Sequence, residues 1–386
     1  MATIKIGDAC DILNGFAFKS ENYVDNGVRI IRIANVQKGY IEDNTPVFYP
    51  LSTSGLEKYM LESGDLLMSL TGNVGRVALL NNEFLPAALN QRVACLRLKS
   101  NIINKKYLFH VLNNDFFEQE CIRSSKGLAQ KNMSTEWLKE YCIPLYPLET
   151  QQYIAATLDK VTHTIDLCNA ILEKLDLLVK ARFVEMFGEP ILNPKGWEMA
   201  TIGDIVTEVK YGTSKPAVDG GKYAYLRMNN LTYDGHLDLT DLKRIDIPDN
   251  EIEKCIVRKG DVLFNRTNSI ELVGKTCVFD KDEDMIIAGY IIRVRLKPVM
   301  LPLIMSYFMN TDALKKKLRS MAKGAVNQAN INAQELKAIK IYLPPTDLQQ
   351  QFADFVAQTD KSKLAVKQVL EKAETLKKAL MQEFFG

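Results

Sequence analysis

The stretch from Pro147 to Gly188 decides the fold, and it reads PLETQQYIAATLDKVTHTIDLCNAILEKLDLLVKARFVEMFG. Between its end residues it contains neither proline nor glycine, the two residue types that most often interrupt a helix. Apolar residues return along it in alternating steps of four and three, with one interruption at Arg182. That spacing predicts one long helix with an apolar seam for a second helix. The predicted seam residues are Ile154, Leu158, Val161, Ile165, Cys168, Leu172, Leu175, Val179 and Met186.

The chain contains a second copy of this stretch, 198 residues further on. The matching pairs include Gln151 with Gln349, Gln152 with Gln350, Leu172 with Leu370 and Gly188 with Gly386. The preceding parts also match, at separations of 196 to 199 residues: Gly7 with Gly203, Asp65 with Asp261, Gly75 with Gly274 and Arg97 with Arg295. A register kept over this length predicts a pseudo-twofold internal repeat, two copies of one domain followed by one helix.

The second predicted helix carries a weaker apolar stripe than the first. Its predicted seam residues are Phe352, Phe355, Thr359, Ser362, Val366, Val369, Ala373, Leu376, Leu380 and Phe384. Such a stripe can also mean core packing or dimerisation, and the stripe alone leaves that alternative open. Two helices in one chain, each about 60 Å long at the α-helical rise, favour an antiparallel coiled coil within the molecule.

The sequence before each helix indicates a mixed domain of strands and short helices. Alternating segments such as Arg29 to Ala34 and Val93 to Leu98 are typical of strands, and Lys106 to Cys121 is typical of a helix. We therefore expect an α+β fold with two tandem mixed α/β domains separated by the two long helices. The expected boundaries are 1–146 and 189–344 for the domains, and 147–188 and 345–386 for the helices.

Composition excludes several other classes of protein. The 386 residues carry 49 Lys and Arg against 47 Asp and Glu, so any anion binding must be local. An odd number of cysteines, seven, argues against a disulfide framework, and three distant histidines leave no metal site to expect. The apolar stretch from Val299 to Met309 is too short to span a membrane, and the first residues alternate like a strand. We expect no membrane contact and a cytoplasmic location.

Polar and basic side chains follow predicted strands in both copies. The segment from Gly15 to Ser20 leads to a strand and then to Asn35 to Lys38, while its counterpart from Tyr211 to Lys215 leads to a strand that ends at Asn229 and Asn230. Amide and basic groups in such places can pair with base edges, and Lys or Ser can hold phosphates. Ordinary solvated turns are the alternative.

The most informative loops are Gly64 to Arg76 and Gly260 to Lys275. Each range begins with a Gly-Asp turn and a strand. The loop after the strand carries Thr, Asn and a basic residue. Around Gly274 the second loop resembles a nucleotide phosphate loop, but Ser269 stands where the first glycine is needed, so we exclude nucleotide binding. Arg266 could pair with a guanine edge, hold a phosphate or close a surface ion pair.

These patterns give a set of candidate nucleic-acid contacts. In the first copy they are Lys19, Ser20, Arg32, Asn35, Gln37, Lys38, Thr71, Asn73, Arg76, Asn90, Gln91 and Arg92. In the second copy they are Tyr211, Thr213, Ser214, Lys215, Arg227, Asn229, Asn230, Asn265, Arg266, Thr267, Asn268, Lys275 and Tyr290.

Catalytic signatures are missing from the sequence. Methyltransferases acting on base amino groups use Asp or Asn before two prolines and an aromatic residue, whereas Pro344 and Pro345 lie between Leu343 and Thr346. The sequence has no helicase phosphate loop, no nuclease metal cluster and no nucleophile with a nearby base. The pattern favours a non-catalytic protein that reads nucleic acid.

In this order the motifs resemble the DNA-specificity subunits of type I restriction-modification enzymes. The resemblance covers essentially the whole chain. It is carried by Gly15 to Ser20, Gly64 to Arg76, Gly260 to Lys275, and the Pro-x-x-x-Gln-Gln starts of the helices at Pro147 and Pro345. Each motif alone is loose, but together and duplicated they are specific.

The resemblance implies two target recognition domains, each reading one part of a split, asymmetric DNA sequence. It also implies that the paired helices set the distance and dock two methyltransferase subunits, with candidate docking residues Gln151, Gln152, Gln349 and Gln350. S-adenosylmethionine would bind the methyltransferase, ATP and Mg would bind the restriction subunits, and this chain would hold no cofactor of its own. The alternative is a free-standing bipartite DNA-binding regulator without methyltransferase partners.

Overall fold

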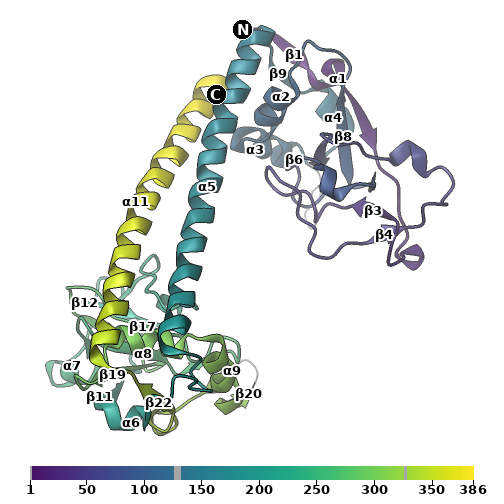
Figure 1. Cartoon of the computed structure of the whole chain (residues 1–386). Coiled ribbons are helices and arrows are strands. Elements are labelled where there is room, and N and C mark those ends of the chain that lie inside the picture. Colours follow the sequence, from purple (N-terminus) through teal and green to yellow (C-terminus); the bar gives the residue numbers. More distant parts are fainter. Residues whose placement is uncertain (1, 126–131, 326–327) are drawn as a thin grey trace. The chain divides into compact units, whose positions relative to one another are not determined.

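A computed structural model describes the whole chain except residues 1, 126–131 and 326–327. The chain divides into two compact units, Met1–Asn169 with Gln368–Gly386 and Ala170–Lys367. Each unit combines one mixed domain with part of both long helices, which are α5 (Leu148–Phe187) and α11 (Thr346–Phe385) (Figure 1). The predicted α+β fold, with two domains and two long helices, is confirmed.

The domain of the first unit is built on an antiparallel four-stranded sheet. Its order is β2 (Cys10–Asn14), β8 (Val93–Leu98), β5 (Leu66–Ser69) and β6 (Val77–Leu79). A second sheet has the order β4 (Phe48–Tyr49), β3 (Val28–Ile31) and β7 (Ala87–Leu89), and β1 (Thr3–Lys5) pairs with β9 (Cys142–Pro144). The short helices are α1 (Ile6–Ala9), α2 (Lys105–Leu112), α3 (Asp115–Ser124) and α4 (Thr135–Glu140).

The domain of the second unit repeats this plan. Its main sheet has the order β11 (Val206–Tyr211), β19 (Ile291–Leu296), β15 (Val262–Asn265) and β17 (Thr276–Val278). The second sheet has the order β13 (Lys243–Ile245), β12 (Tyr223–Leu226), β18 (Met285–Ile287) and β14 (Ile256–Val257). The remaining strands are β16 (Thr267–Asn268), β21 (Gln328–Asn330) and β20 (Lys323–Ala325) in one sheet, and β10 (Glu198–Thr201) paired with β22 (Lys340–Leu343). The short helices are α6 (Ile202–Ile205), α7 (Asp249–Cys255), α8 (Pro302–Met309), α9 (Asp312–Met321) and α10 (Ala333–Lys337).

The repeated Gly-Asp turn has a structural cause in both domains. Asp65 accepts hydrogen bonds from Arg97 Nε at 3.0 Å and Nη2 at 2.7 Å, and Asp261 accepts from Arg295 Nε at 2.8 Å. Each aspartate also accepts a bond from the main-chain nitrogen three residues before it, at 2.8 and 2.9 Å. The aspartate and the arginine are repeated because the nearly buried carboxylate fixes the turn into the strand and pairs with the arginine of the neighbouring strand.

The two long helices pack together in each unit. In the first unit, Leu158 near the start of α5 shares a core with Leu380 and Phe384 near the end of α11. In the second unit, Phe183 near the end of α5 shares a core with Phe352 near the start of α11. Each unit thus shows the antiparallel pairing that the two stripes predict. Phe183 also continues the seam beside Arg182, where the predicted stripe was interrupted.

The predicted seam of α11 is wrong at three positions. Ser362, Val369 and Leu376 are exposed, and the side chains that face inward there are one residue further on, at Lys363, Leu370 and Lys377. The predicted Phe355 packs against the core of the second unit, and its neighbour Val356 is buried as well. The true stripe keeps the same alternation of four and three from Phe352 to Phe384, but it includes two lysines. A lysine can occupy such a position because its alkyl chain packs against apolar neighbours while its ammonium reaches a carboxylate. Lys363 does so with Asp176, at 2.6 Å.

The first glutamine of each Gln-Gln pair is interior, which contradicts its predicted role in docking a partner. Gln151 is 0% exposed and donates from Nε2 to the main-chain oxygens of Ile102 and Tyr146 at 2.9 and 2.8 Å, while its Oε1 accepts from Asn104 N. Gln349 makes the matching three bonds, to Val299, Pro344 and Leu301. Both amides join the start of a long helix to the domain before it, so no polar atom of either side chain is left for another protein.

Candidate nucleic-acid interface

The second domain contains a cavity of about 910 Å³ where the predicted contacts converge. It lies against the ends of β11, β12 and β18, and it is lined by predicted contacts from four separate stretches of sequence. These are Tyr211, Thr213, Ser214, Lys215, Arg227, Asn229, Arg266 and Tyr290. Tyr225, Glu251, Lys254 and Cys255 also line the cavity, and no pattern in the sequence marked them.

The first wall of the cavity depends on a glycine. A Cβ atom at Gly212 would lie 2.1 Å from the oxygen of Ile287 and 2.3 Å from that of Ala288, so only glycine allows the chain to pass β18 this closely. The Tyr225 hydroxyl then donates to the main-chain oxygen of Lys215 at 3.0 Å. These contacts keep the segment from Gly212 to Lys215 along the cavity. Gly15 in the first domain makes the same close approach, to Leu89 and Asn90.

The basic side chains at the cavity are held by partners that leave them partly free. Lys215 pairs with Glu251 at 2.9 Å, and both side chains are about two-fifths exposed. Arg227 pairs with Asp241 at 2.7 Å. The Arg266 guanidinium lies 4.9 Å from the ring centre of Tyr211 and donates to Asn330 Oδ1 at 3.1 Å. Since half-exposed pairs of this kind are weak, a nucleic-acid group can compete for these cations.

Three predicted contacts of the second domain are buried or half-buried and bond within the protein instead. Asn265 is 0% exposed and donates to the oxygens of Thr267 and Tyr290 at 3.1 Å. Asn268 donates to Asn265 Oδ1, and the buried Thr267 accepts from Asn330 at 3.2 Å. These three side chains shape the loop, so their prediction as direct base contacts is corrected.

Asn230 and Lys275 are also buried, and both hold the turn that follows β12. Asn230 accepts from Arg227 N and donates to the oxygen of Asp238, each at 2.8 Å. Lys275 Nζ donates to the oxygen of Met228 at 2.7 Å, and burial lowers the pKa of this ammonium group. Neither side chain can reach a phosphate in this arrangement, so these two predictions are corrected.

Two of the matching residues in the first domain are also buried and hydrogen-bonded within the protein. Asn35, 3% exposed, accepts from Arg32 N at 2.8 Å and donates to Glu42 and Asp43, as Asn230 does in the second domain. Thr71 is buried and donates to Asn132 Oδ1 at 2.7 Å. Asn35 and Thr71 are therefore structural, which corrects their prediction as DNA contacts.

The remaining predicted contacts of the first domain are divided between paired and exposed groups. Arg76 donates to Gln37 Oε1 at 2.7 Å, Lys38 pairs with Glu118 at 2.7 Å, and Arg32 donates to the oxygen of Thr45. Asn90 is half-buried and accepts from Arg92 N at 3.2 Å. Lys38 is exposed as well as paired, and the other exposed predicted contacts are Lys19, Ser20, Asn73, Gln91 and Arg92.

The first domain has an aromatic cluster that begins in the segment from Gly15 to Ser20. None of its rings was among the predicted contacts. Phe16 is 40% exposed, and its ring centre lies 5.1 Å from that of Phe18 and 5.3 Å from that of Tyr59. Phe18 packs in turn on Tyr49. The spacing of Phe16 and Phe18 was the signal available, because side chains two residues apart in an extended segment lie on the same face and can form one cluster.

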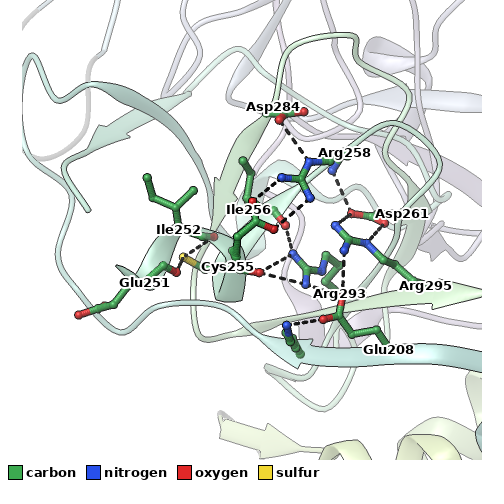
Figure 2. Close-up of polar contacts among 12 residues, drawn as sticks. Glu208, Glu251, Ile252, Cys255, Ile256, Arg258, Asp261, Asp284, Arg293 and Arg295 are labelled. Atoms are coloured by element: carbon green, nitrogen blue, oxygen red, sulfur yellow. Dashed lines mark hydrogen bonds and ion pairs between the residues drawn. The ribbon is translucent and has the colours of Figure 1, made fainter. Parts of the chain in front are cut away.

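Next to helix α7, which contributes to the cavity lining, lies a network of ion pairs centred on Arg293 (Figure 2). Arg293 is 0% exposed and donates from Nη2 to Glu208 Oε2 at 2.8 Å. Arg295 donates to the same oxygen at 3.0 Å and to Asp261. Burial, together with the nearby Arg295, lowers the pKa of Arg293, but a guanidinium stays protonated at neutral pH.

Outside residues 1, 126–131 and 326–327, no three His, Cys, Asp or Glu side chains gather in a way that could hold a metal ion. Within the same described ranges, none of the helices combines the length and the apolar character that crossing a membrane requires.

With the fold and the cavity described, the family of the chain can be assigned. The family model of the type I restriction modification DNA specificity domain matches twice, over residues 1–177 and 194–375. The chain belongs to this family. The two matches coincide with the internal repeat, so each copy is one specificity domain with its long helix.

Other members of the specificity family match over most of their length. The chain is 24% identical to the EcoBI specificity subunit of Escherichia coli, covering 99% of this chain and 85% of that protein. It is 24% identical to the EcoKI specificity subunit of Escherichia coli K12, covering 90% and 79%. A crystal structure of a type I restriction-modification S subunit from M. genitalium has the same fold, with a TM-score of 0.61, 14% identity, and coverage of 100% of this chain and 96% of that one.

Proposed function

We propose that this specificity subunit reads a bipartite, asymmetric DNA target, with one half-site for each domain. The observation that carries the proposal is the cavity of the second domain, where Lys215, Arg227 and Arg266 from separate loops converge beside exposed Tyr290. Cations and amides supply the donors that phosphates and purine edges accept, while tyrosine rings supply apolar contact to bases. The direct contacts of this half-site are assigned to side chains that line the cavity.

The two half-sites are expected to differ, because the two domains carry different side chains at matching places. Arg266 follows β15, whereas Leu70 follows β5 in the first domain. Tyr211 and Thr213 flank Gly212, whereas Asn14 and Phe16 flank Gly15. For the first domain we propose the exposed contacts Lys19, Asn73, Gln91 and Arg92 together with the Phe16 ring.

The outer faces of the two long helices are proposed as the docking surface for methyltransferase subunits. Apolar side chains that do not face the seam are strongly exposed there, which is typical of a surface that another protein covers. On α5 they are Tyr153, Leu167, Leu177, Leu178 and Val184, and on α11 they are Leu364, Val369 and Leu376. Gln152 and Gln350 are exposed and stay in this proposal, in contrast to Gln151 and Gln349.

The chain is proposed to act without catalysis of its own. In this proposal S-adenosylmethionine is bound by the two methyltransferase subunits, and ATP and Mg by restriction subunits, all in the cytoplasm where the target DNA lies. A methyltransferase partner would take the adenine out of the duplex, so this chain needs only groove contacts. A free-standing regulator would have no use for two exposed apolar helix faces, and we do not favour it.

Co-expression with a methyltransferase subunit tests the proposal. The complex should methylate adenine in one split motif, which mapping of N6-methyladenine in the host genome would reveal. Exchange of residues 189–344 for the matching domain of a relative should change one half of the motif and leave the other half as it was. A chain that binds DNA but neither co-purifies with a methyltransferase nor directs methylation would favour the regulator.

A further inference from the structure

Arg293 reaches from the main sheet of the second domain to the end of helix α7. Its Nη1 donates to the main-chain oxygen of Ile256 (Figure 2). Both terminal nitrogens also lie within 3.5 Å of the main-chain oxygen of Glu253. These oxygens belong to the last turn of α7 and the first residue of β14, where a helix leaves carbonyl groups without partners and its dipole attracts a cation. The contact therefore joins β19 to the C-terminal end of α7.

Helix α7 is also one wall of the recognition cavity. Glu251, Lys254 and Cys255 all line the cavity, and Glu251 pairs with Lys215 on the opposite segment at 2.9 Å. The position of α7 thus determines where Glu251 and Lys254 meet a DNA group and how Lys215 is oriented. Because α7 is only seven residues long, its end contacts have a large share in fixing it.

The fold itself does not demand an arginine at this place. In the first domain Cys95 pairs with Leu67 in the register in which Arg293 pairs with Leu263. Burying a guanidinium is costly unless its partners are well placed. The first domain instead uses Arg97 to reach the oxygen of Met60, the residue that matches Ile256, at 3.1 Å. Each domain therefore fixes the same main-chain oxygen, but from a different strand position.

We propose that Arg293 is a positioning residue for DNA recognition, which holds the α7 wall of the cavity and so determines how the second half-site is read. The inference rests on the proposed function of the cavity. Arg293 itself is 0% exposed and touches no DNA. It acts through Glu251, Lys254 and Lys215, whose placement relative to the base edges depends on the end of α7.

The substitution Arg293→Met tests the inference in the complete complex with methyltransferase subunits. Methionine fills the space of the arginine stem, and Glu208 keeps Lys210 and Arg295 as partners, so the chain should still fold and assemble. We expect discrimination at one or two positions of the second half-site to fall by about tenfold, which is the usual cost of one poorly read base pair. The first half-site should be read as before.

The matched variant is Glu208→Gln, which removes the charge next to Arg293 but keeps its bonds to Ile256 and Glu253. Both variants should unfold at a lower temperature than the wild type, yet only Arg293→Met should change the motif. If both variants change the second half-site equally, or if Arg293→Met assembles and keeps the wild-type motif, Arg293 has only a stabilising role.

Arg266→Ala in the same assay separates the inference from the proposed function. Arg266 lines the cavity directly, so its loss should relax the second half-site whether or not Arg293 positions α7. A relaxed motif with Arg266→Ala but not with Arg293→Met overturns the inference alone. An unchanged motif with both variants, together with wild-type affinity for DNA, overturns the assignment of this cavity to DNA as well.

Discussion

Lys275 donates a hydrogen bond from Nζ to the main-chain oxygen of Met228, across 2.7 Å. The residue at the matching place in the first domain, Arg76, donates to Gln37 at 2.7 Å. In both domains the basic residue that follows a glycine thus reaches the loop after a strand of the second sheet. This strand is β3 in the first domain and β12 in the second. The repeated basic residue supports the recognition loops from behind, although its sequence context suggested a phosphate contact.

Replacement of Lys275 by Met should destabilise the second domain by about 1.5 to 3 kcal/mol, the usual value of a hydrogen bond to a charged group. Lys275 is only 7% exposed, so it neutralises no phosphate and releases no counterion from DNA. The slope of DNA affinity against salt concentration should therefore stay the same. Urea unfolding and binding titrations at several salt concentrations measure the two effects. A slope that decreases by about one would mean that Lys275 holds a phosphate after all.

The two glutamines at the start of α5 should respond differently to alanine. Gln151→Ala leaves the main-chain groups of Ile102, Tyr146 and Asn104 without their partner and should cost about 2 to 3 kcal/mol. Gln152→Ala changes an exposed side chain and should stay within about 0.5 kcal/mol. Thermal unfolding of both variants gives the comparison. Equal effects would show that the internal bonds of Gln151 add nothing to stability.

The sequence alone was sufficient for the architecture but only partly for the site. The repeat located both domains and both helices, because Asp65 with Arg97 and Asp261 with Arg295 preserve a structural ion pair. It could not separate Asn229, which lines the cavity, from its neighbour Asn230, which is buried. Asparagine serves equally well as a base reader and as a support for a turn, and only the direction of the side chain decides.

The lysine in the helix seam yields an asymmetric prediction. Lys363 is buried whereas Asp176 is about half exposed, so removing the aspartate leaves the costlier group unpaired. Asp176→Ala should destabilise the second unit by about 1 to 3 kcal/mol, although Asp360 at 3.6 Å still compensates part of the charge. Lys363→Met should be neutral or stabilising, as is usual when an apolar group replaces a buried ion. Urea unfolding decides, and a larger loss with Lys363→Met would contradict this reasoning.

Arg266 is the side chain from which we expect the clearest reading of a base. Tyr211 lies under its guanidinium at 4.9 Å and Asn330 accepts one of its hydrogen bonds, so the group is oriented before DNA arrives. A planar, oriented guanidinium suits the two acceptors of guanine in the major groove. Replacement by alanine should therefore cost about 1 to 3 kcal/mol and relax one or two positions of the second half-site.

The variants Arg266→Lys and Tyr211→Leu distinguish base reading by Arg266 from a phosphate contact. Lysine keeps the charge but not the paired donors, so Arg266→Lys should lose discrimination almost as Arg266→Ala does while keeping the salt dependence. Tyr211→Leu removes the ring under the guanidinium and should give a smaller loss at the same positions. If Arg266→Lys restores the wild-type motif, and Arg266→Ala weakens binding to all sequences with a shallower salt slope, Arg266 holds a phosphate. The guanine-reading role would then pass to Arg227, the other arginine that lines the cavity.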